Sequence, residues 1–103
     1  MNFYIGMSIE ELDYNDYNVR IDEDIYEEYL YKGKFGFKKI NEIDPYENTV
    51  LSKEDILLLI DDCDLVIDYQ NKIDEEFMKD IKELKLLCEK SISDNKNIIC
   101  IGD

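Results

Sequence analysis

Residues 43–59 read IDPYENTVLSKEDILLL and place the only proline of the chain, Pro45, just ahead of its most apolar run. Proline fixes its own φ and pushes Asp44 toward extended backbone, so a helix cannot continue through this point. Ser52 and Asp55, three residues apart, are typical of a capping box and predict that a helix begins after Ser52. The stretch is therefore interpreted mainly as the start of a helix.

Apolar side chains recur at helical spacing in two segments after Pro45, and each segment is predicted to be a helix. The first helix fades near residues 69–72, and the second runs from about Asp74 to residues 94–97, DNKN, which end it. The core stripe of the first helix consists of Ile56, Leu59, Ile60, Cys63, Val66 and Ile67. That of the second helix consists of Phe77, Ile81, Leu84, Leu87, Cys88 and Ile92.

The two ends of the chain have strand-like patterns. Residues 2–9, NFYIGMSI, alternate loosely, and residues 97–101, NIICI, form a short apolar run rich in β-branched side chains. Strands at both ends with helices between them predict a single α+β domain over residues 1–103. We expect a short β-sheet that contains the N- and C-terminal strands, which are candidates for neighbours, together with two or three packed helices.

The segment between the first strand and Pro45 is more polar. Residues 10–19, EELDYNDYNV, are rich in turn formers and predict a loop. Residues 22–32, DEDIYEEYLYK, predict a short amphipathic helix, because apolar side chains four residues apart share one face. These pairs are Ile25 with Tyr29 and Tyr26 with Leu30. Residues 35–40, FGFKKI, are interpreted as extended.

The charge of the chain limits its partners. The formal net charge is −14, from 26 acidic and 12 basic residues. Such a surface repels nucleic-acid phosphates and anionic lipids and attracts cationic proteins. No stretch approaches the roughly 20 apolar residues that span a bilayer, and the N-terminus lacks the pattern of a signal peptide. We therefore expect a cytoplasmic protein that binds neither nucleic acid nor membrane.

Catalytic signatures are absent from the sequence. There is no histidine, which is the usual acid–base residue, and no phosphate loop, nucleophile elbow or zinc-protease motif. The cysteines, Cys63, Cys88 and Cys100, are odd in number, lack C-x-x-C spacing and have apolar neighbours, which predicts buried free thiols. Asp62 and Asp64 flank Cys63 and would raise its thiol pKa. The chain is therefore predicted not to be an enzyme and to need no cofactor.

Two acidic patterns could form a binding site. Residues 11–31 contain five of the eight tyrosines interleaved with carboxylates, and tyrosine is enriched at binding hot spots. The candidate partner-binding residues in this segment are Asp13, Tyr14, Asp16, Tyr17, Glu27 and Glu28. The alternative is one face of the first long helix, where Asp61, Asp64 and Asp68 fall at i, i+3 and i+7. Three carboxylates on one face could also hold a hard cation, but the EF-hand pattern is missing, so a solvated or partner-facing face is preferred and no metal is expected.

The segment IDPYENTVLSKEDI and the ending NIICIGD together resemble a group of small bacterial proteins with an "IDPYGDTV" type motif, a helical pair and a closing Gly-Asp. These proteins are similar to immunity proteins, the antidotes of polymorphic or contact-dependent toxin systems. The resemblance covers residues 37–103, and Glu47 and Asn48 replace the Gly-Asp of the motif. It implies a cognate basic protein toxin, such as a nuclease, as partner, and no catalytic residues.

Two other classes of function stay open. An acidic nucleic-acid mimic or regulatory adaptor would use the same carboxylates to bind a host DNA-handling protein. A metal-dependent or carboxylate enzyme would instead bind calcium or manganese tightly. The toxin, the oligomeric state and the strand order are not determined by the sequence.

Overall fold

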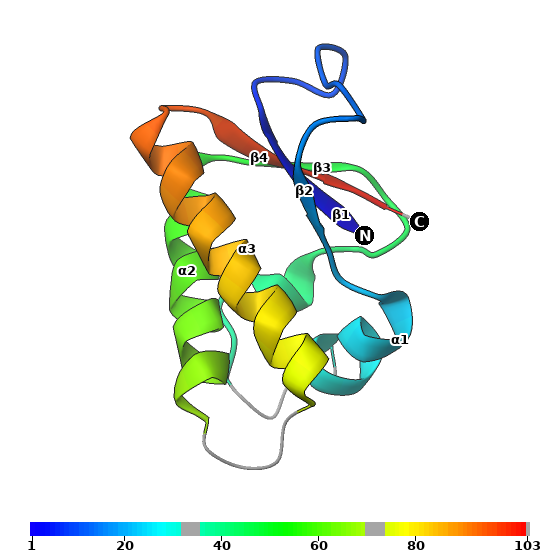
Figure 1. Cartoon of the computed structure of the whole chain (residues 1–103), viewed down its shortest axis with the longest axis vertical. Helices are drawn as coiled ribbons and strands as arrows, with labels where there is room; N and C mark the ends of the chain where they lie inside the picture. The colour runs from blue at the N-terminus through cyan, green and yellow to red at the C-terminus, as the bar shows by residue number, and fades with distance from the viewer. Residues whose placement is uncertain (32–35, 70–73, 103) are drawn as a thin grey trace.

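Four strands form one antiparallel sheet in the order β2-β1-β4-β3, in a computed structural model that describes residues 1–31, 36–69 and 74–102 (Figure 1). The strands are β1 (Asn2–Gly6), β2 (Asn18–Arg20), β3 (Thr49–Leu51) and β4 (Asn97–Ile101). β1 and β4 pair along their whole length, from Asn2 opposite Ile101 to Gly6 opposite Asn97. The predicted α+β class is confirmed, and the two terminal strands are neighbours at the centre of the sheet.

The two edge strands are only three residues long, and the sequence pattern did not predict either of them. Asn18 and Val19 lie in β2 rather than in the predicted loop, and Val19 pairs with Phe3. β3 follows the turn at Pro45, and its Leu51 pairs with Ile98. Both strands form because the central β1–β4 pair leaves unpaired backbone N–H and C=O groups along each outer side.

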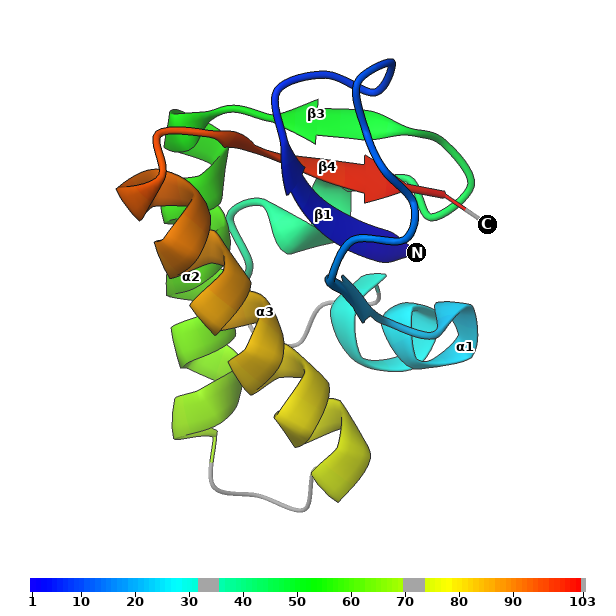
Figure 2. The same ribbon diagram turned by 45° about the horizontal axis from the view of Figure 1, so that its top comes forward.

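Two long helices lie side by side beneath the sheet, as Figure 2 shows. α2 (Lys53–Asp68) begins after Ser52, whose backbone N–H donates to the Asp55 carboxylate at 3.2 Å, so the predicted cap is confirmed. α3 (Glu75–Ser93) begins after Asp74, whose carboxylate accepts two backbone N–H groups of the first turn. In the part of the chain that the structure covers, none of the helices combines the length and apolarity that crossing a bilayer would require.

The apolar stripes of both helices form the core with the inner face of the sheet. In α2 the buried members are Ile56, Leu59, Cys63 and Val66, and the half-buried ones are Ile60 and Ile67. In α3 the buried members are Phe77, Ile81, Leu84, Leu87 and Cys88, and Ile92 is half-buried. The sheet contributes Phe3, Val19, Leu51, Ile98 and Cys100. The predicted core of both helices is confirmed.

The segment after β2 is helical, but its geometry differs from the expected α-helix. One α-helical turn, α1 (Glu23–Ile25), continues as a π-helix, η1 (Tyr26–Tyr31). Tyr26 and Leu30 are nevertheless fully buried, and the ring of Tyr29 stacks on Phe77 with centroids 4.8 Å apart. The predicted core-facing side chains are therefore correct, because tertiary packing rather than the helix type decides which side of the segment is buried.

Residues 36–40 do not form a strand, so the expectation of extended structure there is wrong within the described residues. A 3₁₀-helix, η2 (Ile40–Glu42), begins at Ile40 instead. The backbone N–H groups of residues 38–40 bond to the buried Asp62 carboxylate of α2 and not to a neighbouring strand, as described below. Phe35 lies outside the described residues.

Residues 7–17, which link β1 to β2, lie over part of the outer face of the sheet, where Val50 of β3 stays exposed. Tyr4 and Ile99 are paired across the central strands and lie on this face, opposite to the helices. The ring of Tyr14 meets that of Tyr4 edge-on, with centroids 6.0 Å apart and an interplanar angle of 82°. The loop thus lies on one side of the sheet, while α2 and α3 cover the other.

Candidate partner-binding surface

The four candidate residues of the first loop lie together on its exposed turn. The Asp13 carboxylate accepts the backbone N–H of Asn15 at 2.9 Å, and the Asp13 carbonyl accepts that of Asp16 at 3.0 Å. This turn holds Tyr14 and Tyr17 outward, with 56% and 68% of their surface exposed. Two aromatic rings are therefore largely exposed to solvent next to Asp13 and Asp16 on an ordered turn.

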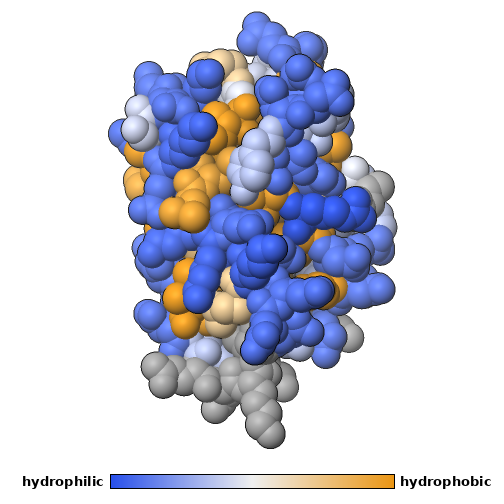
Figure 3. All heavy atoms as spheres, in the orientation of Figure 1, coloured by the Kyte–Doolittle hydropathy of each residue, from blue (hydrophilic) through white to orange (hydrophobic). Residues whose placement is uncertain are grey.

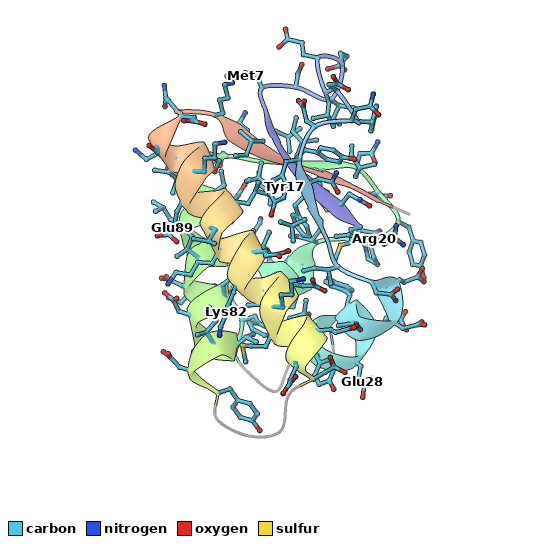
Figure 4. All side chains as sticks on the ribbon, in the orientation of Figure 1. Met7, Tyr17, Arg20, Glu28, Lys82 and Glu89 are labelled. Carbon is cyan, nitrogen blue, oxygen red and sulfur yellow. The ribbon has the colours of Figure 1, made fainter. Side chains whose placement is uncertain are left out.

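Tyr17 borders a groove between this loop and α3. The groove has a volume of about 420 Å³, and Ile5 and Leu87 are among its lining residues. Leu86 lies on its rim and is 66% exposed. Figure 4 shows Tyr17 beside α3, and Figure 3 shows apolar surface between the polar residues of the same face. Leu86 and Tyr17 are the two most exposed large apolar side chains of the described residues, and they share one groove.

Acidic and basic side chains both line this groove. Asp16, Glu83 and Asp94 contribute carboxylates, and Lys90 and Lys96 contribute ammonium groups. The sequence pattern did not identify Leu86 as part of a site. Leu86 lies off the core stripe of α3, however, and a leucine in such a position is a candidate for contact with another surface.

Glu27 and Glu28 do not join the loop residues. Both are exposed on η1, and Figure 4 places Glu28 far from Tyr17, near the other end of the molecule. A single clamp made of Asp13, Asp16, Glu27 and Glu28 is therefore not formed by this fold. The reason is that β2 carries the chain along the edge of the sheet before η1 begins.

The alternative acidic face on α2 is partly neutralised. Asp61 lies 3.2 Å from the Lys38 ammonium, and Asp64 lies 2.6 Å from that of Lys85, whose pKa is raised by this hydrogen bond. Asp68 is exposed at the end of the helix. Surface ion pairs of this kind add little to stability, but they reduce the charge available to a partner. Among the described residues, no three Asp, Glu, His or Cys side chains are placed to hold a metal ion.

The buried member of the same acidic run has a different role. Asp62 is fully buried, and its carboxylate accepts the backbone N–H groups of Lys38, Lys39 and Ile40, each at 2.8 Å. Asp61 and Asp64 pair with lysines at the surface, whereas Asp62 fixes the segment that leads into η2. The sequence pattern identifies Asp62 only as a neighbour of Cys63 and does not predict this role.

The three cysteines are buried free thiols, as predicted. Burial, followed by the nearby Cys88 thiol and the carboxylates of Asp62 and Asp64, raises the pKa of Cys63 far above its ordinary value. Burial and then Glu89 raise the pKa of Cys88 to about 12. Neither thiol is placed to act as a nucleophile near neutral pH, because the thiolate is the reactive form.

No protein-family model, curated protein or solved structure was found to match this chain.

Proposed function

We propose that this chain is a non-catalytic antidote of the immunity-protein type, which binds a basic protein toxin and covers its active surface. The observation that carries the proposal is the ordered turn at residues 13–17, which exposes Tyr14 and Tyr17 next to the carboxylates of Asp13 and Asp16, beside the Leu86 groove. Rigid aromatic side chains supply most of the binding energy in many interfaces, and surrounding charges raise the association rate.

The proposed mechanism is steric and electrostatic. The net charge of −14 attracts a cationic protein from a distance, and Asp13 and Asp16 orient it at close range. Tyr17 and Leu86 then pack against apolar surface of the toxin. For a nuclease toxin, the carboxylates would occupy subsites that otherwise bind substrate phosphates.

The test is co-expression with the product of the neighbouring gene, followed by purification of the complex and measurement of binding kinetics. We expect Tyr17→Ala to weaken binding about 30-fold or more, the effect of losing a hot-spot side chain. Asp16→Asn should lower mainly the association rate and its salt dependence. Because both side chains are exposed, neither change should alter the Tm substantially.

The matched control is the pair Leu57→Ala and Asp68→Asn, which alters the exposed face of α2. We expect these variants to bind like the unchanged protein. If they weaken binding while Tyr17→Ala does not, the interface is the α2 face and the loop assignment is wrong. A complex that is indifferent to salt and to every one of these changes would exclude the electrostatic antidote mechanism, and binding only to a DNA-handling host protein would favour the adaptor class.

A further inference from the structure

A second cavity, of about 410 Å³, lies between η1 and the Pro45 segment. Tyr26 and Ile43 lie on its inner side and are almost fully buried, whereas Tyr46 is 57% exposed at its rim. The volume is within the range of pockets that bind small molecules or single side chains. This cavity is separate from the Tyr17 groove, with which it shares no lining residue.

The walls of the cavity are fixed by hydrogen bonds. The Tyr26 hydroxyl bonds to the carbonyl oxygens of Ile40, at 3.1 Å, and of Ile43. The Asp44 carboxylate accepts the backbone N–H of Tyr46 at 2.9 Å and stabilises the turn at Pro45. A ligand would therefore meet a wall that is already ordered, which lowers the entropic cost of binding.

The lining offers hydrogen-bond acceptors and negative charge. Its ionisable carboxylates are those of Glu27, Glu42 and Asp44, and none of the described residues that line it is basic. Lys39 reaches Glu42 only at 3.7 Å and is not part of the lining. In addition, the side-chain oxygen of Asn41, another lining residue, is buried and accepts no hydrogen bond. A buried acceptor without a donor is unfavourable. Because this oxygen is closed off from solvent, the half-buried Asn41 side chain would have to turn toward the cavity before a ligand could donate to it.

We infer that this cavity is a receptor site for a guanidinium group, supplied by an arginine side chain of the basic partner. The inference rests on the proposed function for the source of that arginine. A guanidinium is always charged, has five N–H donors and no acceptor, and stacks on aromatic rings such as that of Tyr46. It therefore matches a cavity whose walls carry carboxylates, an amide oxygen and an exposed tyrosine. The site would anchor the partner at a second point, on the side of the molecule that contains Glu27.

The test uses a fragment and needs no toxin. The ¹⁵N-labelled full chain is titrated with N-acetyl-arginine methylamide and, in parallel, with its citrulline counterpart, which is similar in shape but neutral. We expect the arginine fragment to shift the backbone amide resonances of residues 41–44 and 46 and the Asn41 side-chain amide, with a millimolar Kd. The citrulline fragment should leave them unchanged.

Two glutamates provide a matched pair of variants. Glu42 lines the cavity, whereas Glu47 is exposed outside it. Glu42→Gln should weaken arginine binding about fivefold, as expected for losing one charge contact, and Glu47→Gln should not change it. Equal effects of the two variants, or shifts spread over the whole acidic surface, would overturn the assignment. That result would leave the Tyr17 surface and the antidote proposal intact, since those depend on toxin binding.

Discussion

Replacing Asp62 with alanine removes the carboxylate that accepts three backbone N–H groups from residues 38–40. The Ile40 donor is buried, whereas those of Lys38 and Lys39 are partly buried and can be reached by water. Losing the partner of one buried donor costs about 1–3 kcal/mol, and each partly hydrated donor costs less. We therefore expect Asp62→Ala to lower the free energy of unfolding by about 2–5 kcal/mol in total. Because a domain of this size is stabilised by only about 5–15 kcal/mol, this is a severe loss.

The assay is urea denaturation followed by far-UV circular dichroism, with Asp61→Ala as the control one residue away. Asp61 is exposed and makes only a surface ion pair with Lys38, so its replacement should cost no more than about 1 kcal/mol. Asp62→Asn keeps one acceptor oxygen and should fall between the two. An unfolding free energy for Asp62→Ala within about 0.5 kcal/mol of that for Asp61→Ala would show that the buried carboxylate does not hold this segment in place.

Three further predictions concern stability. Gly102→Ala should lower the free energy of unfolding, measured by urea denaturation, by about 1–3 kcal/mol, because a Cβ atom there would lie 2.5 Å from backbone atoms of residues 46–47. Gly6→Ala should lower it less, because the added Cβ would meet only side chains. Tyr26→Phe should lower the free energy of unfolding by about 1–3 kcal/mol in the same assay, because it leaves buried carbonyl oxygens without their hydroxyl donor. Tyr17→Phe, at an exposed position, should leave it unchanged. Partial burial and then Glu83 raise the pKa of Asp80, so its charged form destabilises the fold. Asp80→Asn should thus raise the Tm by about 2–4 °C at pH 7, and the difference should vanish below about pH 3, where aspartate is protonated in both states; equal Tm differences at both pH values would contradict this.

Local signals made part of the fold predictable. Pro45, Ser52 and Asp55 lie close together in the sequence and define the start of α2. The apolar run at residues 97–101 is by itself enough to predict β4. The edge strands β2 and β3 depend on hydrogen bonds to β1 and β4, so their three-residue sequences contain no such signal. The π-helical form of η1 has no signal in the spacing of its side chains either, because the same residues would share one face of an α-helix.

The candidate site was predictable only in part. The exposed loop tyrosines were identified from their polar surroundings, but the distance between Glu28 and Tyr17 depends on the path of β2, which the sequence pattern does not reveal. Asp62 could have been distinguished from its acidic neighbours, because it lies three residues after Leu59 and four before Val66, on the buried stripe of α2. Composition alone does not distinguish Asp62 from Asp61 and Asp64.

The positions of the cysteines give the protein an internal set of reporters. Cys63, Cys88 and Cys100 lie in α2, α3 and β4, so the two long helices and one central strand each contain one thiol that a reagent cannot reach in the folded state. Alkylation of the native protein therefore requires an opening of the element concerned, and its rate measures the free energy of that opening. Mass spectrometry of the three labelled peptides would show which parts of the domain open separately and which open only when the whole chain unfolds.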